Sequence, residues 1–111
     1  LDLSFFSIFL STTLSHPLII TSAYRSPEYN ARISHTGLWG PHTTGRAVDI
    51  KIVGAAAYAL IQAAMKLDFT GIGIKQHGPL EHRYIHLDDL ENSTRPEHEC
   101  PRPRIWTYPS Q

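Results

Sequence analysis

The 111-residue sequence contains little cysteine, carries no excess of charge and has no long hydrophobic run. Its one cysteine, Cys100, cannot form an intramolecular disulfide, and a structural zinc site built from several thiolates is excluded. Ten basic and ten acidic side chains cancel, which leaves no global attraction to nucleic acid or to an anionic membrane. We therefore expect no nucleic-acid partner and no membrane span.

No internal repeat, low-complexity tract or linker divides the chain, so we expect a single domain over residues 1–111 that acts as a monomer. A domain of this length buries roughly two-thirds of its unfolded surface, so a bound metal would add usefully to its stability. The apolar residues 3–14 are too short to cross a bilayer, and neither a basic segment nor a cleavage site of the signal-peptide kind flanks them. Their spacing predicts an amphipathic first helix.

The pattern of the remaining chain predicts an α+β fold, with a small, mostly antiparallel sheet and helices packed on one face. Tyr58, Ile61 and Met65 recur at helical spacing and are expected to pack on the sheet. The expected elements are a strand at 18–22, a short helix from 26, a strand at 47–53, a helix at 54–66, a hairpin at 71–76 and 83–88, and an edge strand at 104–108.

Three side chains form a candidate zinc site on the other face of this sheet. Asp49 lies seven positions after His42, and His86 stands in the second strand of the predicted hairpin. Two imidazoles and one carboxylate hold zinc while leaving a fourth position for water, which is typical of catalytic sites. Gly45 permits the turn between the first two ligands. The sequence therefore predicts one catalytic zinc ion per chain.

Three segments in order carry a family resemblance. They are Ser-Ala-Tyr-Arg-Ser-Pro-Glu-Tyr-Asn at 22–30, His-x-x-Gly-x-Ala-x-Asp-Ile at 42–50 and Tyr-Ile-His-Leu-Asp at 84–88. Together they resemble the zinc D-alanyl-D-alanine carboxypeptidase family, which includes L-alanyl-D-glutamate endopeptidases and shares its zinc core with lysostaphin-type peptidases and the hedgehog signalling domain. The resemblance runs from about residue 18 to 106. It implies a peptidase that cuts peptidoglycan stem peptides and holds zinc with His42, Asp49 and His86.

The general base is where the sequence departs from that family. Many relatives have a glutamate three residues before the final histidine ligand, and others have a histidine two before it. Arg83 and Tyr84 stand at these positions here. The nearest substitutes lie in the hairpin loop: Glu81 and His82 rank equally as the base, and His77 comes third.

The resemblance also implies roles for residues around the metal. Arg25 matches the arginine that binds the scissile carbonyl or a substrate carboxylate, for which a permanently charged fork is suited. The alternative for Arg25 is a surface salt bridge to Glu28. Tyr24 is expected to frame the substrate-binding loop beside it rather than to catalyse. Asp88 shares the strand face of His86 and is expected to orient a ligand or an arginine.

These patterns favour a zinc-dependent peptidase of peptidoglycan stem peptides, of the carboxypeptidase or the endopeptidase type. The alternative is a zinc-binding module that recognises cell-wall peptides or a protein partner without cutting them, since Arg83 replaces the usual glutamate. A wall substrate implies a periplasmic or extracellular site of action.

Overall fold

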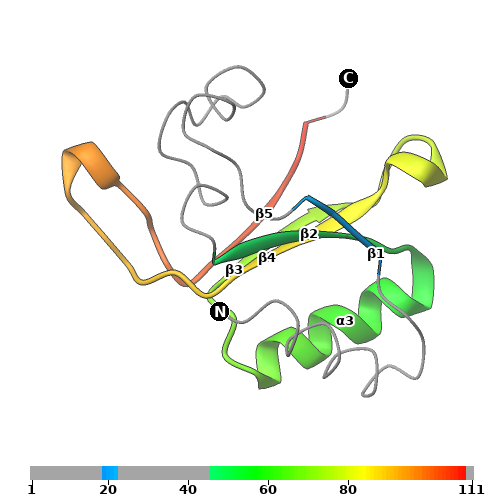
Figure 1. Cartoon of the computed structure of the whole chain (residues 1–111), viewed down its shortest axis with the longest axis horizontal. Coiled ribbons are helices and arrows are strands. Elements are labelled where there is room, and N and C mark those ends of the chain that lie inside the picture. The colour runs from blue at the N-terminus through cyan, green and yellow to red at the C-terminus, as the bar shows by residue number, and fades with distance from the viewer. Residues whose placement is uncertain (1–18, 23–45, 110–111) are drawn as a thin grey trace.

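The computed structural model describes residues 19–22 and 46–109 (Figure 1). The first helix expected at 3–14, the short helix expected from 26, and the segment that carries Tyr24, Arg25 and His42 lie outside the described residues. The elements are β1 (Ile19–Ser22), β2 (Ala47–Lys51), α3 (Gly54–Lys66), β3 (Gly71–Lys75), η2 (Leu80–His82), β4 (Tyr84–Asp88), η3 (Pro96–His98) and β5 (Arg104–Thr107), where η denotes a short 3₁₀ helix.

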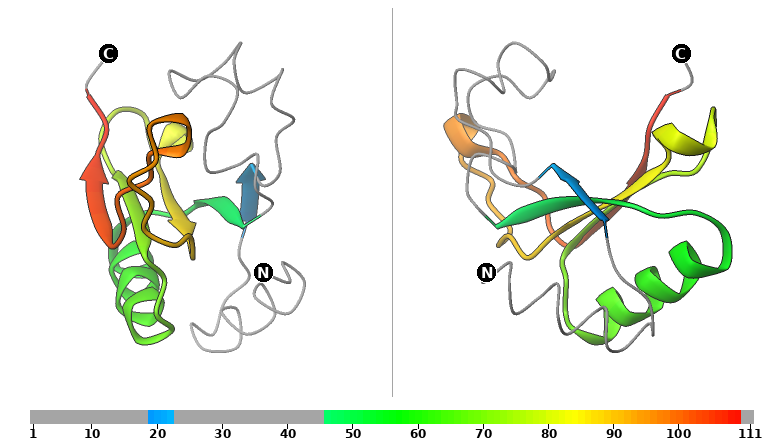
Figure 2. Two further views of the ribbon diagram at one scale, coloured as in Figure 1. Left: turned by 90° about the vertical axis from the view of Figure 1, so that its left-hand side faces the viewer. Right: turned by 45° about the vertical axis from the view of Figure 1, so that its right-hand side comes forward.

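The strands form one five-stranded sheet in the order β1-β2-β4-β3-β5. The first three neighbouring pairs are antiparallel, and β5 pairs in parallel with β3 at the sheet edge. Helix α3 lies against one face of the sheet. The chain between β4 and β5 extends beyond the sheet from the end of β4 and returns to it at β5 (Figures 1 and 2). The predicted α+β class, the mostly antiparallel sheet and the position of β5 at an edge are confirmed.

The core forms between α3 and the sheet because the strands alternate apolar and polar residues. Val48 and Ile50 of β2 and Ile85 and Leu87 of β4 are completely buried on the helix side. The helix contributes small residues and one leucine to the same cluster: Ala57, Leu60, Ala63 and Ala64. Packing between these two layers leaves the opposite sheet face for polar residues.

The predicted helix at 54–66 has the predicted bounds, but the stripe assigned to its buried face is wrong. Tyr58 and Met65 are 73% and 51% exposed, and only Ile61 packs against the core. The alanines that recur beside Leu60 face the sheet instead. Small side chains let the helix backbone approach the strands closely, so the two large residues lie on the outer side.

No helix in the part of the chain that the structure describes is both long enough and apolar enough to cross a membrane.

Candidate metal centre

The sheet face opposite α3 is arranged in cross-strand rows. The row at the centre consists of Asp49, His86, Gly73 and Trp106, one from each of β2, β4, β3 and β5. The row beside it consists of Ala47, Asp88, Gly71 and Arg104. Directly opposed residues project to the same face and have neighbouring side chains. Asp49 and His86, two of the three predicted zinc ligands, are cross-strand partners of this kind.

Asp49 and His86 meet at one point. The Nδ1 atom of His86 lies 3.0 Å from Oδ1 of Asp49, and the two side chains are 3% and 12% exposed. Burial alone would lower the pKa of His86, but the hydrogen bonds and negative charges of Asp49 and Asp88 raise it above its usual 6.5. An imidazole nitrogen and a carboxylate oxygen converging in a buried site are donors that suit zinc.

The third predicted ligand, His42, lies outside the described residues. Among the residues that the structure does describe, no group of three metal-binding side chains converges. The observed pair thus supplies two of the three expected donors, and the complete ligand set stays a prediction.

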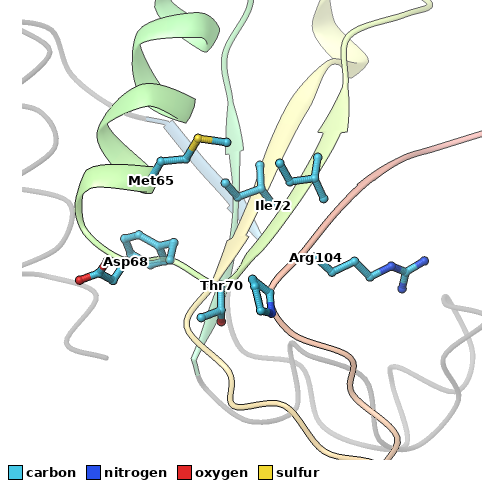
Figure 3. Close-up of a pocket in the computed structure, with 8 residues that line it drawn as sticks. Met65, Asp68, Thr70, Ile72 and Arg104 are labelled. Atoms are coloured by element: carbon cyan, nitrogen blue, oxygen red, sulfur yellow. The ribbon is translucent and has the colours of Figure 1, made fainter.

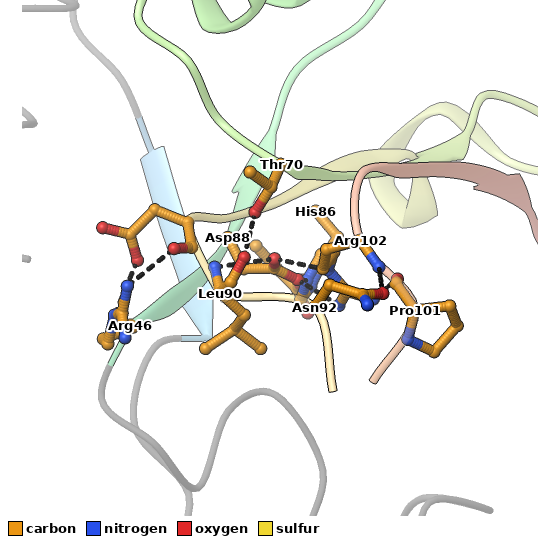
Figure 4. Close-up of polar contacts among 10 residues, drawn as sticks. Arg46, Thr70, His86, Asp88, Leu90, Asn92, Pro101 and Arg102 are labelled. Carbon is orange, nitrogen blue, oxygen red and sulfur yellow. Dashed lines mark hydrogen bonds and ion pairs between the residues drawn. The ribbon is translucent and has the colours of Figure 1, made fainter. Parts of the chain in front are cut away.

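The second ring nitrogen of His86 faces a different carboxylate. Its Nε2 atom lies 2.8 Å from Oδ2 of Asp88, which is completely buried (Figure 4). Arg102 donates from Nε to Oδ1 at 2.8 Å and from Nη2 to Oδ2 at 2.7 Å. Burial alone would raise the pKa of Asp88, but the bonds from His86 and Arg102 lower it to about 2. Asp88 therefore remains a carboxylate at neutral pH.

Two glycines of β3 make room for these side chains. A Cβ atom on Gly73 would lie 2.7 Å from both Nε1 of Trp106 and the hydroxyl oxygen of Tyr108, and one on Gly71 would collide with the Asp88 carboxylate. Glycine within a strand often marks such a close approach. The space that Gly73 leaves beside His86 is thus filled by the side chains of Trp106 in β5 and of Tyr108, which follows β5.

Trp106 and Tyr108 form an aromatic wall beside the histidine. The Trp106 ring lies 5.1 Å from the His86 ring between centroids, and the Tyr108 ring lies 5.3 Å from that of Tyr84. Burial raises the pKa of Tyr108 above its usual 10, and the charges of Tyr84 and Asp49 add to this shift. Sequence reasoning missed this wall and Arg102, although the Gly-Ile-Gly run of β3 signals a close approach.

The base candidates lie before the start of β4. Glu81 and His82 are exposed and belong to η2, and the backbone carbonyl of His82 accepts a bond from Nζ of Lys75 at 3.2 Å. The Nε2 atom of His77 lies 3.1 Å from the carbonyl oxygen of Tyr108. Arg83, at the family's usual glutamate position, donates from Nε to the carbonyl of Gly78 at 3.0 Å. The identity of the base stays a prediction.

A separate apolar pocket lies between the end of α3 and β5 (Figure 3). Its lining includes Met65, Phe69, Ile72 and Ile105. The candidate site residues in the described part of the chain do not line it. We therefore place the candidate chemistry on the polar sheet face and not in this pocket.

The fold and the site define a small α+β domain in which the sheet face opposite α3 carries a buried imidazole–carboxylate pair. The family model described as Peptidase M15 matches residues 9–88, most of the chain, and this span includes His42, Asp49 and His86. The chain therefore belongs to the peptidase M15 family, whose members are typically zinc peptidases. No significant match was found among curated proteins or among solved structures.

Proposed function

We propose that the protein is a zinc-dependent peptidase that hydrolyses peptidoglycan stem peptides. The observation that carries the proposal is the buried pair of Asp49 and His86, with its donor atoms 3.0 Å apart on the sheet face opposite α3 in a peptidase M15 domain. His42, seven positions before Asp49 and within the matched span, completes the proposed ligand set. Such a substrate places the activity in the periplasm or outside the cell.

Zinc, when bound, polarises the scissile carbonyl and lowers the pKa of a water molecule towards about 7. The protein's own residues orient the substrate and move the proton. Arg25 is proposed to bind the carbonyl oxygen on which negative charge develops, with Tyr24 framing the substrate loop. Glu81 or His82 is proposed to take the proton from water and to pass it to the leaving amine, since the exposed loop before β4 carries both.

A second candidate function is peptide recognition without cleavage. Arg83 and Tyr84 occupy the positions where relatives carry their base, and neither suits that task. The Arg83 guanidinium is permanently charged and bonded to the carbonyl of Gly78, while the Tyr84 ring packs at a tilt of 59° against the ring of Tyr108. Under this alternative the zinc site binds wall peptides or a protein partner and leaves them intact.

Incubation of zinc-loaded protein with purified muropeptides tests the two candidates. Hydrolysis predicts new amino termini or free D-alanine, whereas recognition alone predicts bound but unchanged peptides. His86→Ala is expected to lose zinc and hydrolysis together, because it removes one of only three ligands. Hydrolysis that persists in metal-free protein would contradict the proposal.

The same assay identifies the base. Glu81→Gln or His82→Ala, whichever removes the base, is expected to lower the turnover number by about 100- to 10,000-fold while zinc stays bound. The other variant serves as the control, since it lies in the same short helix.

A further inference from the structure

We infer that Asp88 and Arg102 form a positioning pair for His86, which fixes the imidazole so that its Nδ1 atom is presented to the metal. The inference rests on the proposed zinc site and assigns it two residues that are not ligands. Asp88 acts directly on the histidine, and Arg102 acts through Asp88.

The geometry of the imidazole supports this assignment. The Nδ1 atom of His86 points to Asp49, the other ligand in the described residues, while Nε2 lies 2.8 Å from Oδ2 of Asp88. A neutral imidazole carries a hydrogen on one nitrogen and a lone pair on the other. A carboxylate that accepts from Nε2 therefore leaves the Nδ1 lone pair for a metal, and it also fixes the plane of the ring.

Arg102 holds the Asp88 carboxylate in place. Its two bonds, 2.8 Å to Oδ1 and 2.7 Å to Oδ2, form a bidentate pair in which the arginine side chain is 4% exposed and the aspartate is not exposed at all. Planar forks of this kind restrict both distance and orientation. Because the pair is almost fully buried, solvent screens it less than a surface ion pair, and it restrains the histidine more firmly.

Two neighbouring features bring Arg102 to this position. The chain after β4 leaves the sheet and returns with Arg102 just before β5, and the backbone N–H of Arg102 bonds to Oδ1 of Asn92 at 3.0 Å (Figure 4). The guanidinium carbon lies 5.1 Å from the ring centroid of Trp106, and the same indole ring lies 5.1 Å from the His86 ring between centroids. Arg102 thus contacts both Asp88 and Trp106, two of the side chains that lie against the histidine ring, and a cation over indole is a favourable contact.

The molecule contains a matched control in the next residue. Asp89 accepts a bond from Nε of Arg46 at 3.0 Å, so it also pairs with an arginine. These side chains are 33% and 39% exposed, and this pair includes no histidine. Asp89→Asn therefore removes a carboxylate of the same type beside the site without changing the bonds of His86.

The experiment measures zinc affinity by competition with a chelator in four proteins: wild type, Asp88→Asn, Asp89→Asn, and Asp88→Asn combined with Arg102→Met. Asp88→Asn is expected to raise the zinc dissociation constant by about 10- to 100-fold, and Asp89→Asn to leave it within twofold. The double variant removes the buried guanidinium that Asp88→Asn leaves unpaired, so it keeps the test valid if the single variant folds poorly. Because Arg102 acts through Asp88, the double variant should bind zinc no more weakly than Asp88→Asn.

A spectroscopic readout separates positioning from general loosening of the fold. In zinc-loaded wild-type protein the Nε2–H proton of His86 should resonate far downfield and exchange slowly, because it is bonded to a buried carboxylate. Asp88→Asn should shift that resonance upfield, and Asp89→Asn should not move it. Wild-type affinity and an unshifted resonance in Asp88→Asn would overturn the inference, whereas a wild-type protein that binds no zinc would overturn the proposed function itself.

Discussion

His86 is bonded at both ring nitrogens, and each bond has a different consequence. Asp49 lies at Nδ1, where the two side chains could both bind one metal ion. Asp88 lies at Nε2, and the charge of its carboxylate is already balanced by Arg102. The two aspartates are therefore not interchangeable, although both contact the same imidazole. One is placed to bind the metal and the other to orient the histidine.

The strand pattern was enough to predict that Asp49 and His86 share a face, since residues of neighbouring strands alternate with period two. The same pattern placed Asp88 beside His86. Arg102 was beyond prediction because 14 positions separate it from Asp88, across a segment without regular periodicity. When an irregular segment brings two side chains together, their spacing in the sequence follows no helix or strand period and does not predict the contact.

At the residue scale, the buried phenol of Tyr108 is expected to lower the free energy of unfolding at alkaline pH. Burial raises the pKa of its phenol above the usual 10, so the unfolded chain releases this proton first and the folded state loses stability as the pH rises above about 10. Urea unfolding followed by circular dichroism across this pH range measures the effect. Tyr108→Phe should show a smaller alkaline loss than wild type.

The control for that measurement is Tyr58→Phe, because the side chain of Tyr58 is 73% exposed. Its alkaline loss should equal that of the wild type. If Tyr108→Phe lost as much stability as the wild type over the same pH range, the buried phenol would not be the cause.

At the scale of elements, β3 makes room for the site because two of its residues are glycines, which have no side chain. Gly71 and Gly73 leave two positions of the polar face open, and the Asp88 carboxylate and the Trp106 indole occupy that space. Element bounds were predictable here, since the strands and α3 follow clear periodicities. The buried face of α3 was not, because alanine carries too weak a signal to outweigh the large residues Tyr58 and Met65.

Gly73→Ala is expected to destabilise the fold by about 1–3 kcal/mol, because the new methyl group would lie 2.7 Å from the Trp106 and Tyr108 side chains. Zinc affinity should fall with it, since Trp106 would be displaced beside His86. The midpoint of urea unfolding measures the first effect. Lys75→Ala, two positions along the same strand face, should change stability by less than about 0.5 kcal/mol. Equal effects of the two substitutions would contradict the close approach at Gly73.

At the scale of the whole molecule, the domain is small, and the core formed by residues 46–109 lies between α3 and the sheet. A ligand that binds only the folded state stabilises it by about 2.7 kcal/mol at a hundredfold excess over its dissociation constant. Zinc would therefore contribute appreciably to the stability of this domain as well as to its chemistry. The metal would also connect the segment that carries His42 to β2 and β4.

The most direct test of this account is the zinc content of the purified protein. We predict one zinc ion per chain in the wild type, none in Asp49→Ala or His86→Ala, and one in Asp89→Asn, with folding of each protein checked by circular dichroism. A folded wild-type protein without zinc, or full zinc content in either ligand variant, would contradict the central claim that Asp49 and His86 hold a catalytic metal.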